Sequence, residues 1–325
     1  MIIPEYWAEG RVQDRQQGHQ ITVRRFGWSD ISQADAQAHA DRRAHEALER
    51  IQSGEKLVRR EPKRAYNGAE GVPIREEILS RHGDTIITRN TYGARCLNTP
   101  QTLFADIDFE NRSTLRTSVL VFSVLFVCAA AASWMSQSWT LGLVLVLLAA
   151  LLSYPLAAVL DRLIQKISGG ADRMSLRLLE QFISRHPAWN LRIYRTPAGL
   201  RVLATHQTFH PADTDASSFF SETGTDPLYV KMCKNQQCFR ARVSPKPWRI
   251  SIPSHMKPRP GVWPISPEQL PVRNRWVTQY EAVAQAYAAC AYTHSLGSGF
   301  VHPDIQDVIT LHDDLSGALS QRPIA

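Results

Sequence analysis

The chain has 325 residues, of which 44% are hydrophobic and 21% charged, and its formal net charge is +7. The 44 consecutive residues from Thr117 to Leu160 contain no Asp, Glu, Lys or Arg. An uncharged stretch of this length excludes a purely soluble enzyme, and the lack of further long apolar stretches excludes a many-helix transporter.

Strands and helices are predicted before the uncharged stretch. Ser29 or Ser32 can cap a helix that runs through an alanine-rich segment to about Ile51. Pro73 begins a short predicted helix that Gly83 ends. The turn-rich segment NTYGARCLNTP separates the last two predicted strands. The predicted strands are Gln20–Phe26, Thr85–Arg89 and Thr102–Phe109.

The uncharged stretch divides into two runs at the polar residues 135–138. The runs Thr117–Trp134 and Trp139–Leu160 would each span about 27–33 Å as helices, which is one hydrocarbon thickness. A hairpin buried in a large soluble core is the alternative, but soluble helices rarely lack a polar face for so long. The sequence therefore predicts a transmembrane hairpin at 115–163, with helices at about 117–135 and 139–160.

Charge and residue size indicate how this hairpin is oriented and packed. The turn carries no charge, whereas Arg and Lys residues lie just outside both helices, so both chain termini should be cytoplasmic. Small residues in both helices allow close contact, and Pro155 should kink the second helix. The flanking cations are Arg112, Arg116, Arg162, Lys166, Arg173 and Arg177, and the small residues are Ala129–Ala132, Gly142, Ala149, Ala150, Ala157 and Ala158.

A second series of elements follows the hairpin. The amphipathic segment Ala171–His186 predicts a helix. Eight prolines between Pro245 and Pro271 preclude regular elements there, so an ordered or extended loop is expected. The other predictions are strands at Leu191–Tyr194, Leu200–Thr205, Leu228–Met232 and Cys238–Val243, a helix at Arg275–Ala291 and a glycine-rich turn at Ser295–Gly299.

These elements predict an α+β cytoplasmic domain with an inserted two-helix transmembrane hairpin. The strand Thr102–Phe109 ends seven residues before the apolar run, which is too close for a separate linker. We therefore expect one domain built from both flanks, in the inner membrane of a bacterium. Its parts are an N-terminal cytoplasmic part at 1–114, the hairpin at 115–163 and a C-terminal cytoplasmic part at 164–325.

Two aspartates give the sharpest local pattern. Asp106 and Asp108 lie two residues apart on a predicted strand, so their carboxylates share one face. Paired carboxylates at a strand end can hold Mg²⁺ or Mn²⁺ over a triphosphate. An edge strand with its acidic face in solvent explains the pattern equally, because Leu103, Ala105 and Ile107 would fill the opposite face.

The order of an Asp-x-Asp strand, a helix and a Thr-Pro-Ala-Gly turn between strands resembles the core of archaeo-eukaryotic primase-polymerases. This resemblance covers about 40 residues, and Val202 stands where the family has His. It implies a degenerate core that binds nucleotide without polymerising. The segments AYNGAEGVPIREEI, RNTYGARCLNTPQTLFADIDF and CFRARVSPKPWRI also resemble a family of bacterial two-helix membrane proteins, a resemblance that implies no activity.

Four residues after the hairpin could form a zinc site. His206 and His210 are four residues apart, and Cys233 and Cys238 are five apart on a predicted hairpin. His and Cys are the usual zinc ligands, but the thiol spacing lies at the edge of the usual range. Ordinary core or turn residues are the alternative.

The proline-rich basic segment 230–276 contains ten Lys and Arg residues against Glu268 alone, interleaved with Phe239, Trp248, Trp263 and Trp276. This composition suits nucleic acid or nucleotide, or anionic lipid beside the bilayer, and a solvated positive face is the third interpretation.

We expect a membrane-anchored module that binds a phosphate-bearing ligand, either nucleotide or nucleic acid, with Asp106 and Asp108 as metal ligands. The alternatives are a nucleotidyl-transfer enzyme of primase-polymerase type and a non-catalytic anchor that recruits protein partners. The residues predicted to neutralise phosphate are Arg195, Arg201, Arg240, Arg242, Lys246 and Arg249.

Overall fold

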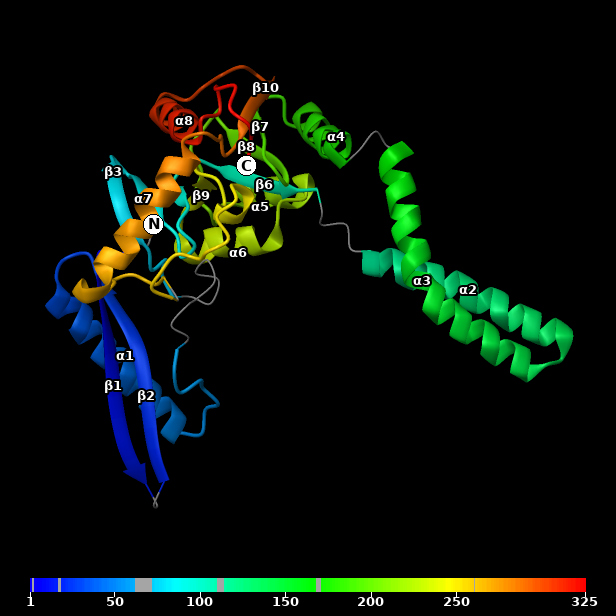
Figure 1. The fold of residues 1–325 in the computed structure, drawn as a ribbon, viewed down its shortest axis with the longest axis horizontal. Helices are drawn as coiled ribbons and strands as arrows, with labels where there is room; N and C mark the ends of the chain where they lie inside the picture. The colour runs from blue at the N-terminus through cyan, green and yellow to red at the C-terminus, as the bar shows by residue number, and fades with distance from the viewer. Residues whose placement is uncertain (2, 17–18, 62–71, 110–113, 168–170, 260) are drawn as a thin grey trace.

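The structure is a computed structural model that describes residues 1, 3–16, 19–61, 72–109, 114–167, 171–259 and 261–325. It is a mixed α+β protein with two long apolar helices, and Figure 1 shows these helices projecting away from the rest of the chain.

An N-terminal hairpin and one helix form a small unit. Strands β1 (Tyr6–Gln16) and β2 (His19–Ser29) pair antiparallel, and α1 (Gln33–Gln52) packs against both. Of the two predicted capping residues, Ser29 and Ser32, Ser32 caps α1, and its side chain accepts from the Asp35 backbone N–H. The helix buries a row of alanines, which lets its backbone lie close to the strands.

Two four-stranded antiparallel sheets form the main body. One sheet has the order β3-β4-β5-β9, and the other has the order β10-β7-β8-β6. Both sheets contribute to one buried hydrophobic cluster, which contains Leu97 and Ala241 from the first and Phe104 and Val202 from the second. The strand bounds are β3 (Glu77–His82), β4 (Thr85–Arg89), β5 (Arg95–Thr99), β6 (Phe104–Asp108), β7 (Asn190–Arg195), β8 (Gly199–Ala204), β9 (Phe239–Arg242) and β10 (Ala291–Gly297).

Helices surround these sheets in the main body (Figure 1). Phe182 of α4 and Phe219 of α5 meet edge to face with ring centroids 5.0 Å apart. On α8, the His312 ring lies 5.2 Å from Phe104 of β6 and 4.7 Å from Tyr194 of β7, so α8 packs against that sheet. The helices are α4 (Ala171–Arg185), α5 (Thr214–Thr223), α6 (Pro227–Gln236), α7 (Leu270–Ala284) and α8 (Pro303–Ser316), with single 3-10 turns at Pro247–Arg249 and Pro267–Gln269.

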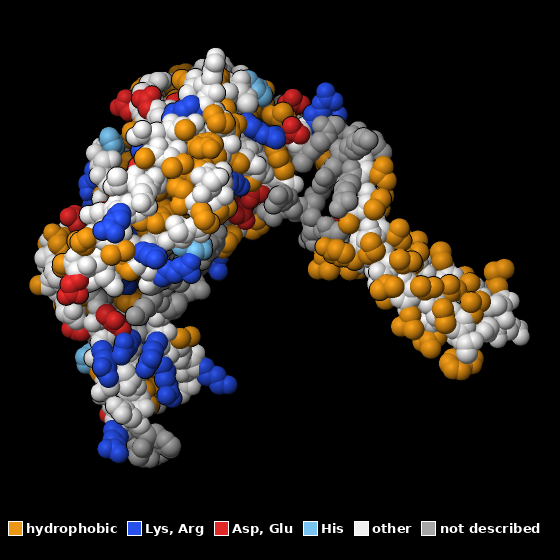
Figure 2. Space-filling model, viewed as in Figure 1, with side chains coloured by type: hydrophobic (Ala, Val, Ile, Leu, Met, Phe, Trp, Pro, Cys, Tyr) orange, Lys and Arg blue, Asp and Glu red, His pale blue; other side chains and the backbone are white. Residues whose placement is uncertain are grey.

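Helices α2 (Thr114–Ser136) and α3 (Trp139–Ile167) are long and apolar enough to cross a membrane. Only 11% and 17% of their apolar windows are buried, and Figure 2 shows hydrophobic side chains over the visible face of this hairpin. Its inner face is made of small residues, and a Cβ at Gly142 would lie 2.6 Å from Ser133 Oγ. Figure 1 also shows a bend in α3, which contains Pro155.

The chain leaves one sheet for this hairpin and then returns to it. Strand β6 precedes α2, and β8 follows α4, yet β6 and β8 pair antiparallel with Asp106 opposite Arg201. Segments from the two flanks of the hairpin are therefore hydrogen-bonded neighbours.

Several local predictions are wrong. The segment from Pro73 forms β3 instead of a helix, because pairing with β4 outweighs its helical pattern. Leu228–Met232 lies in α6, which Asp226 caps and Pro227 begins. The expected turn at 295–299 includes the end of β10, the segment NTYGARCLNTP contains β5, and α7 begins at Leu270 rather than Arg275.

Four of the cations predicted to flank the hairpin cannot be placed: Arg112 and the side chains of Arg116, Arg162 and Lys166 lie outside the described residues.

Candidate functional site

Asp106 is held inside the sheet by Arg201. Arg201 Nε donates to Asp106 Oδ1 at 2.8 Å, and Arg201 Nη2 donates to Asp106 Oδ2 at 3.2 Å. The Arg201 side chain is 1% exposed and that of Asp106 is 31% exposed. Burial raises the pKa of Asp106, but the Arg201 charge and hydrogen bonds outweigh it, and the pKa is lowered. Arg201 is thus committed to a carboxylate of its own chain.

Asp108 has a different environment at the end of the same strand. Asp108 is more exposed than Asp106, and its pKa is raised by desolvation and by the negative charges of Asp106 and Asp226. Asp226 caps α6, and its backbone N–H donates to Asp106 O at 3.2 Å. Lys246 and Arg242 act in the opposite direction and lower the Asp108 pKa. Carboxylates and cations therefore lie close enough here to shift the pKa of Asp108 in opposite directions.

The cations come from β9 and the turn that follows it. Arg201 Nη1 donates to the backbone oxygen of Arg242 at 2.7 Å, which joins β9 to the other sheet. Partial burial and the positive charges of Arg242 and Arg249 lower the pKa of Lys246 to about 8. Asp108 and Asp106 only partly offset this effect. We call Asp108, Arg242, Lys246 and Arg249 the Lys246 site.

Helix α7 fixes the position of the turn that carries Lys246. The Tyr280 hydroxyl donates to Pro245 O at 2.7 Å and lies 2.6 Å from Ser244 Oγ. Ser244 Oγ in turn accepts from the Arg95 backbone N–H at 2.7 Å. The proline-rich loop is therefore ordered next to the site, with a 3-10 turn at Pro247–Arg249.

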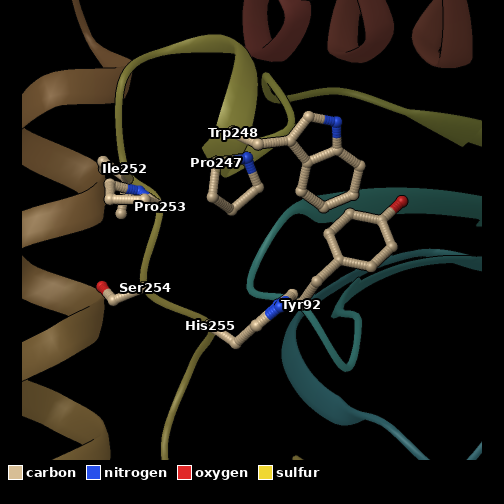
Figure 3. Close-up of a pocket in the computed structure, with 7 residues that line it drawn as sticks. All are labelled: Tyr92, Pro247, Trp248, Ile252, Pro253, Ser254 and His255. Carbon is tan, nitrogen blue, oxygen red and sulfur yellow. The ribbon is translucent and has the colours of Figure 1, made fainter.

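A pocket of about 490 Å³ adjoins the Lys246 site. Figure 3 shows the rings of Tyr92 and Trp248 side by side, with Ile252 and Pro253 across from them. Lys246 Nζ lies 5.5 Å from the centre of the Trp248 ring. The pocket is lined by Tyr92, Pro247, Trp248, Ile252, Pro253, Ser254 and His255, and we call it the aromatic pocket.

Two of the predicted phosphate-binding arginines lie elsewhere. Arg240 is buried and donates to both oxygens of Glu76, at 2.8 and 2.6 Å, so it belongs to the core. Arg195 pairs with Asp172 at 3.3 Å, and its guanidinium lies 4.6 Å from the centre of the Phe109 ring. Of the predicted arginines and lysine, Arg242 and Lys246 act electrostatically on Asp108, and Arg249 acts on Lys246.

The structure does not assemble the predicted zinc ligands. Cys233 lies in α6 and Cys238 just after it, both fully buried, and burial raises the pKa of Cys238 to about 12. The centroid of the His206 ring lies 4.5 Å from that of Trp189, and His210 is exposed in the same loop between β8 and α5. Within the described residues, which include these four, no group of three or more His, Cys, Asp or Glu is placed to hold a metal ion. The expected Cys233–Cys238 hairpin is wrong, because the first cysteine is helical.

Sequence reasoning missed a buried polar chain beneath α8. Cys290 Sγ lies 3.9 Å from His312 Nε2, and His312 Nδ1 lies 3.0 Å from Asp313 Oδ1. Arg192 Nη2 donates to Asp313 Oδ2 at 2.6 Å. Cys290 and His312 are fully buried, so we interpret this chain as a core network. The sequence shows only late histidines beside aspartates.

Sequence reasoning also missed Tyr92, because nothing in the turn-rich segment marks it as a site residue. In the structure Arg242 interacts with the Tyr92 hydroxyl, which connects the aromatic pocket to the cations.

The fold and the site define an α+β protein with two long apolar helices and a mixed-charge site beside an aromatic pocket. No protein-family model, curated protein or solved structure matches the chain.

Proposed function

We propose that the protein is a membrane-anchored module that binds a phosphate-bearing ligand at the Lys246 site. The observation that supports this most directly is that Arg242, at the end of β9, and Arg249, in the turn that follows, both lower the pKa of Lys246 through their positive charges. Bringing like charges together is unfavourable, and a bound anion would relieve the repulsion. Arginine and lysine are the usual phosphate-binding side chains.

Asp108 provides the second half of the proposed site. Desolvation raises the pKa of Asp108, the negative charges of Asp106 and Asp226 add to this effect, and Lys246 and Arg242 act against it. Mg²⁺ is commonly held by one or two carboxylates together with phosphate oxygens of the ligand. In this proposal Asp108 would hold Mg²⁺ or Mn²⁺, whose charge would help Lys246 and Arg242 to neutralise the phosphate of the ligand. Asp106 would not bind the ion directly, because Arg201 donates hydrogen bonds to both of its oxygens, and it would contribute only through its negative charge.

The hairpin α2–α3 would anchor this module by crossing the bacterial inner membrane twice. Its exposed hydrophobic surface supports the crossing, because a core helix of a soluble protein would be mostly buried. The pairing of β6 with β8 supports a single domain into which the hairpin is inserted. The cytoplasmic position of both termini rests on the flanking positive charges.

This orientation has its own test in intact cells. Ser136 lies at the exposed end of α2, and Cys128 is the exposed native cysteine of that helix. In a Cys128→Ala background, Ser136→Cys should react with a membrane-impermeant maleimide added outside cells whose outer membrane is permeabilised. Labelling only after the inner membrane is broken would contradict the proposed topology.

The pairing of Asp106 with Arg201 disfavours nucleotidyl transfer as the function. Two-metal transfer requires carboxylates that can each reach an ion, and Asp106 is occupied by a buried guanidinium.

Thermal melting of the full chain in detergent tests ligand binding. We expect inorganic tripolyphosphate with Mg²⁺ or Mn²⁺ to raise the melting temperature more than either component alone. Lys246→Gln should remove the increase, whereas Lys234→Gln, at an exposed lysine in the last turn of α6, should keep it. If the ligand and metal raised the melting temperature of Lys246→Gln as much as that of Lys234→Gln, or did not raise that of the wild type, the proposal would be overturned.

A further inference from the structure

We infer that the ligand is a nucleotide, whose base enters the aromatic pocket while its phosphates bind the Lys246 site. This inference rests on the proposed function and adds the ligand class. It starts from a pocket with aromatic walls that shares its edge with a cluster of cations.

The pocket and the cations are joined at two points. Lys246 precedes Pro247 and Trp248 in the chain, and its ammonium lies 5.5 Å from the Trp248 ring centre. Tyr92 lies in the turn between β4 and β5, and its hydroxyl interacts with Arg242 at the end of β9. A molecule that fills the pocket therefore has cations directly beside it, as a base linked to phosphates requires.

The volume and the apolar walls of the pocket suit a planar ring. Its volume of about 490 Å³ lies in the range that small-molecule and cofactor sites occupy. The centroids of the Tyr92 and Trp248 rings lie 5.2 Å apart with their planes tilted by 59°, and Trp248 remains 52% exposed, so part of its indole surface is accessible to a ligand. Ile252 and Pro253 form the opposite apolar wall (Figure 3). Stacking on aromatic side chains is how proteins hold bases without reading sequence.

Both walls are fixed by the same side chain of α7. Trp276 Nε1 donates to Ser254 O at 3.1 Å and contacts Ser254 Oγ at 3.2 Å. The turn that carries Tyr92 packs on the other side of this indole, because a Cβ at Gly93 would lie 2.3 Å from the Trp276 ring. Asn90 Oδ1 accepts from the Tyr92 and Ala94 N–H groups and shapes that turn. The pocket is thus preformed, which lowers the entropic cost of binding.

A phospholipid headgroup is a less suitable ligand for this pair of sites. It would supply the phosphate but no planar ring, and it would leave Tyr92 and Trp248 without a partner. The polar groups at the lower edge, Ser254 and His255, could instead meet the polar edge of a base (Figure 3).

Titration of the full chain in detergent with ATP and with tripolyphosphate, both with Mg²⁺, tests the inference. Wild type should bind ATP about tenfold more tightly than tripolyphosphate, because stacking adds to phosphate binding. Trp248→Ala should reduce ATP affinity to that of tripolyphosphate and leave tripolyphosphate affinity unchanged. Phe300→Ala, which removes another exposed aromatic side chain (56% exposed), should change neither.

A spectroscopic variant separates stacking from loss of structure. Trp248→Phe keeps an aromatic ring, so ATP affinity should persist while ATP-dependent quenching of tryptophan fluorescence disappears. Equal affinities of wild type for ATP and tripolyphosphate would overturn the nucleotide inference and leave the proposed function standing. Failure of both ligands to bind would overturn the proposed function itself. Equal binding of short-chain phosphatidic acid and ATP would show a lipid site instead.

Discussion

Asp106 and Arg201 form an ion pair between neighbouring strands that lie on opposite sides of the hairpin in the sequence. The two side chains are 95 residues apart in the chain, and Arg201 Nε lies 2.8 Å from Asp106 Oδ1. The pair explains why the two aspartates of β6 are not equivalent. Asp106 stabilises the fold, whereas Asp108 remains available to a ligand.

Removing the Asp106 charge should destabilise the protein. Asp106→Asn leaves the buried Arg201 guanidinium without its counter-charge, and breaking such a pair costs about 3 kcal/mol. Because the folded pKa of Asp106 is lowered, its stabilisation is present above the usual pKa and is lost as the pH falls through the folded pKa. Thermal melting of the full chain in detergent measures the loss.

Asp108→Asn is the matched control, because the same substitution removes an exposed carboxylate whose pKa is raised by desolvation and by its acidic neighbours. It should leave stability unchanged within about 0.5 kcal/mol or increase it slightly. Equal destabilisation by the two variants would show that the Asp106–Arg201 pair has no special structural role.

Phosphate binding should weaken as Lys246 loses its proton. With a pKa of about 8 in the free protein, Lys246 is mostly charged at pH 7 and mostly neutral at pH 9. A bound anion favours the charged form, so tripolyphosphate affinity should fall about tenfold between these pH values. Lys246→Arg should make the affinity nearly constant over this range. A wild-type affinity that does not change with pH would rule out Lys246 as the titrating group.

Gly93 should be required for the aromatic pocket to form. Its φ is +104°, and an added Cβ would collide with the Trp276 ring. Gly54 offers a matched control, because its φ is +95° but nothing lies within 4 Å of its Cβ position. Gly93→Ala should therefore cost about 2 kcal/mol more than Gly54→Ala and should also weaken ATP binding. Melting and titration of both variants check this, and similar effects would contradict the packing of the turn on Trp276.

Small residues should control how closely α2 and α3 pack. Ala129 and Ala149 are buried between the helices, whereas the adjacent Ala130 and Ala150 are exposed. Ala129→Leu or Ala149→Leu should loosen the hairpin by about 1–3 kcal/mol, because the added volume separates the helices. Ala130→Leu and Ala150→Leu add the same volume toward lipid and should be tolerated. Thermal stability in lipid nanodiscs distinguishes the two pairs.

The hairpin could be predicted because its signal is local. Forty-four uncharged residues with a polar turn specify two apolar helices without reference to the rest of the chain. Strands β4, β6, β7 and β8 were also predictable from their local patterns. Strand β3 was not, since its pairing with β4 is a tertiary feature and its isolated sequence has a helical pattern.

The candidate site was only partly predictable for the same reason. Asp108, Arg242, Lys246 and Arg249 are visible in the sequence as an acidic strand and a basic loop. The sequence does not show that Arg201 and Arg240 lie outside the site. Arg201 is bound by Asp106 and Arg240 by Glu76, which is 164 residues from Arg240 in the chain. Tyr92 joins the pocket only through the turn that Trp276 supports.

The most direct test of the account is the dissociation constant of Mg²⁺-tripolyphosphate for the full-length protein in detergent at pH 7. Saturable binding should weaken at least about tenfold in Lys246→Gln, which loses a charge-assisted hydrogen bond, and remain unchanged in Lys234→Gln. Asp108→Asn should weaken binding only when Mg²⁺ is present. The same dissociation constant for wild type and Lys246→Gln would contradict the proposed site.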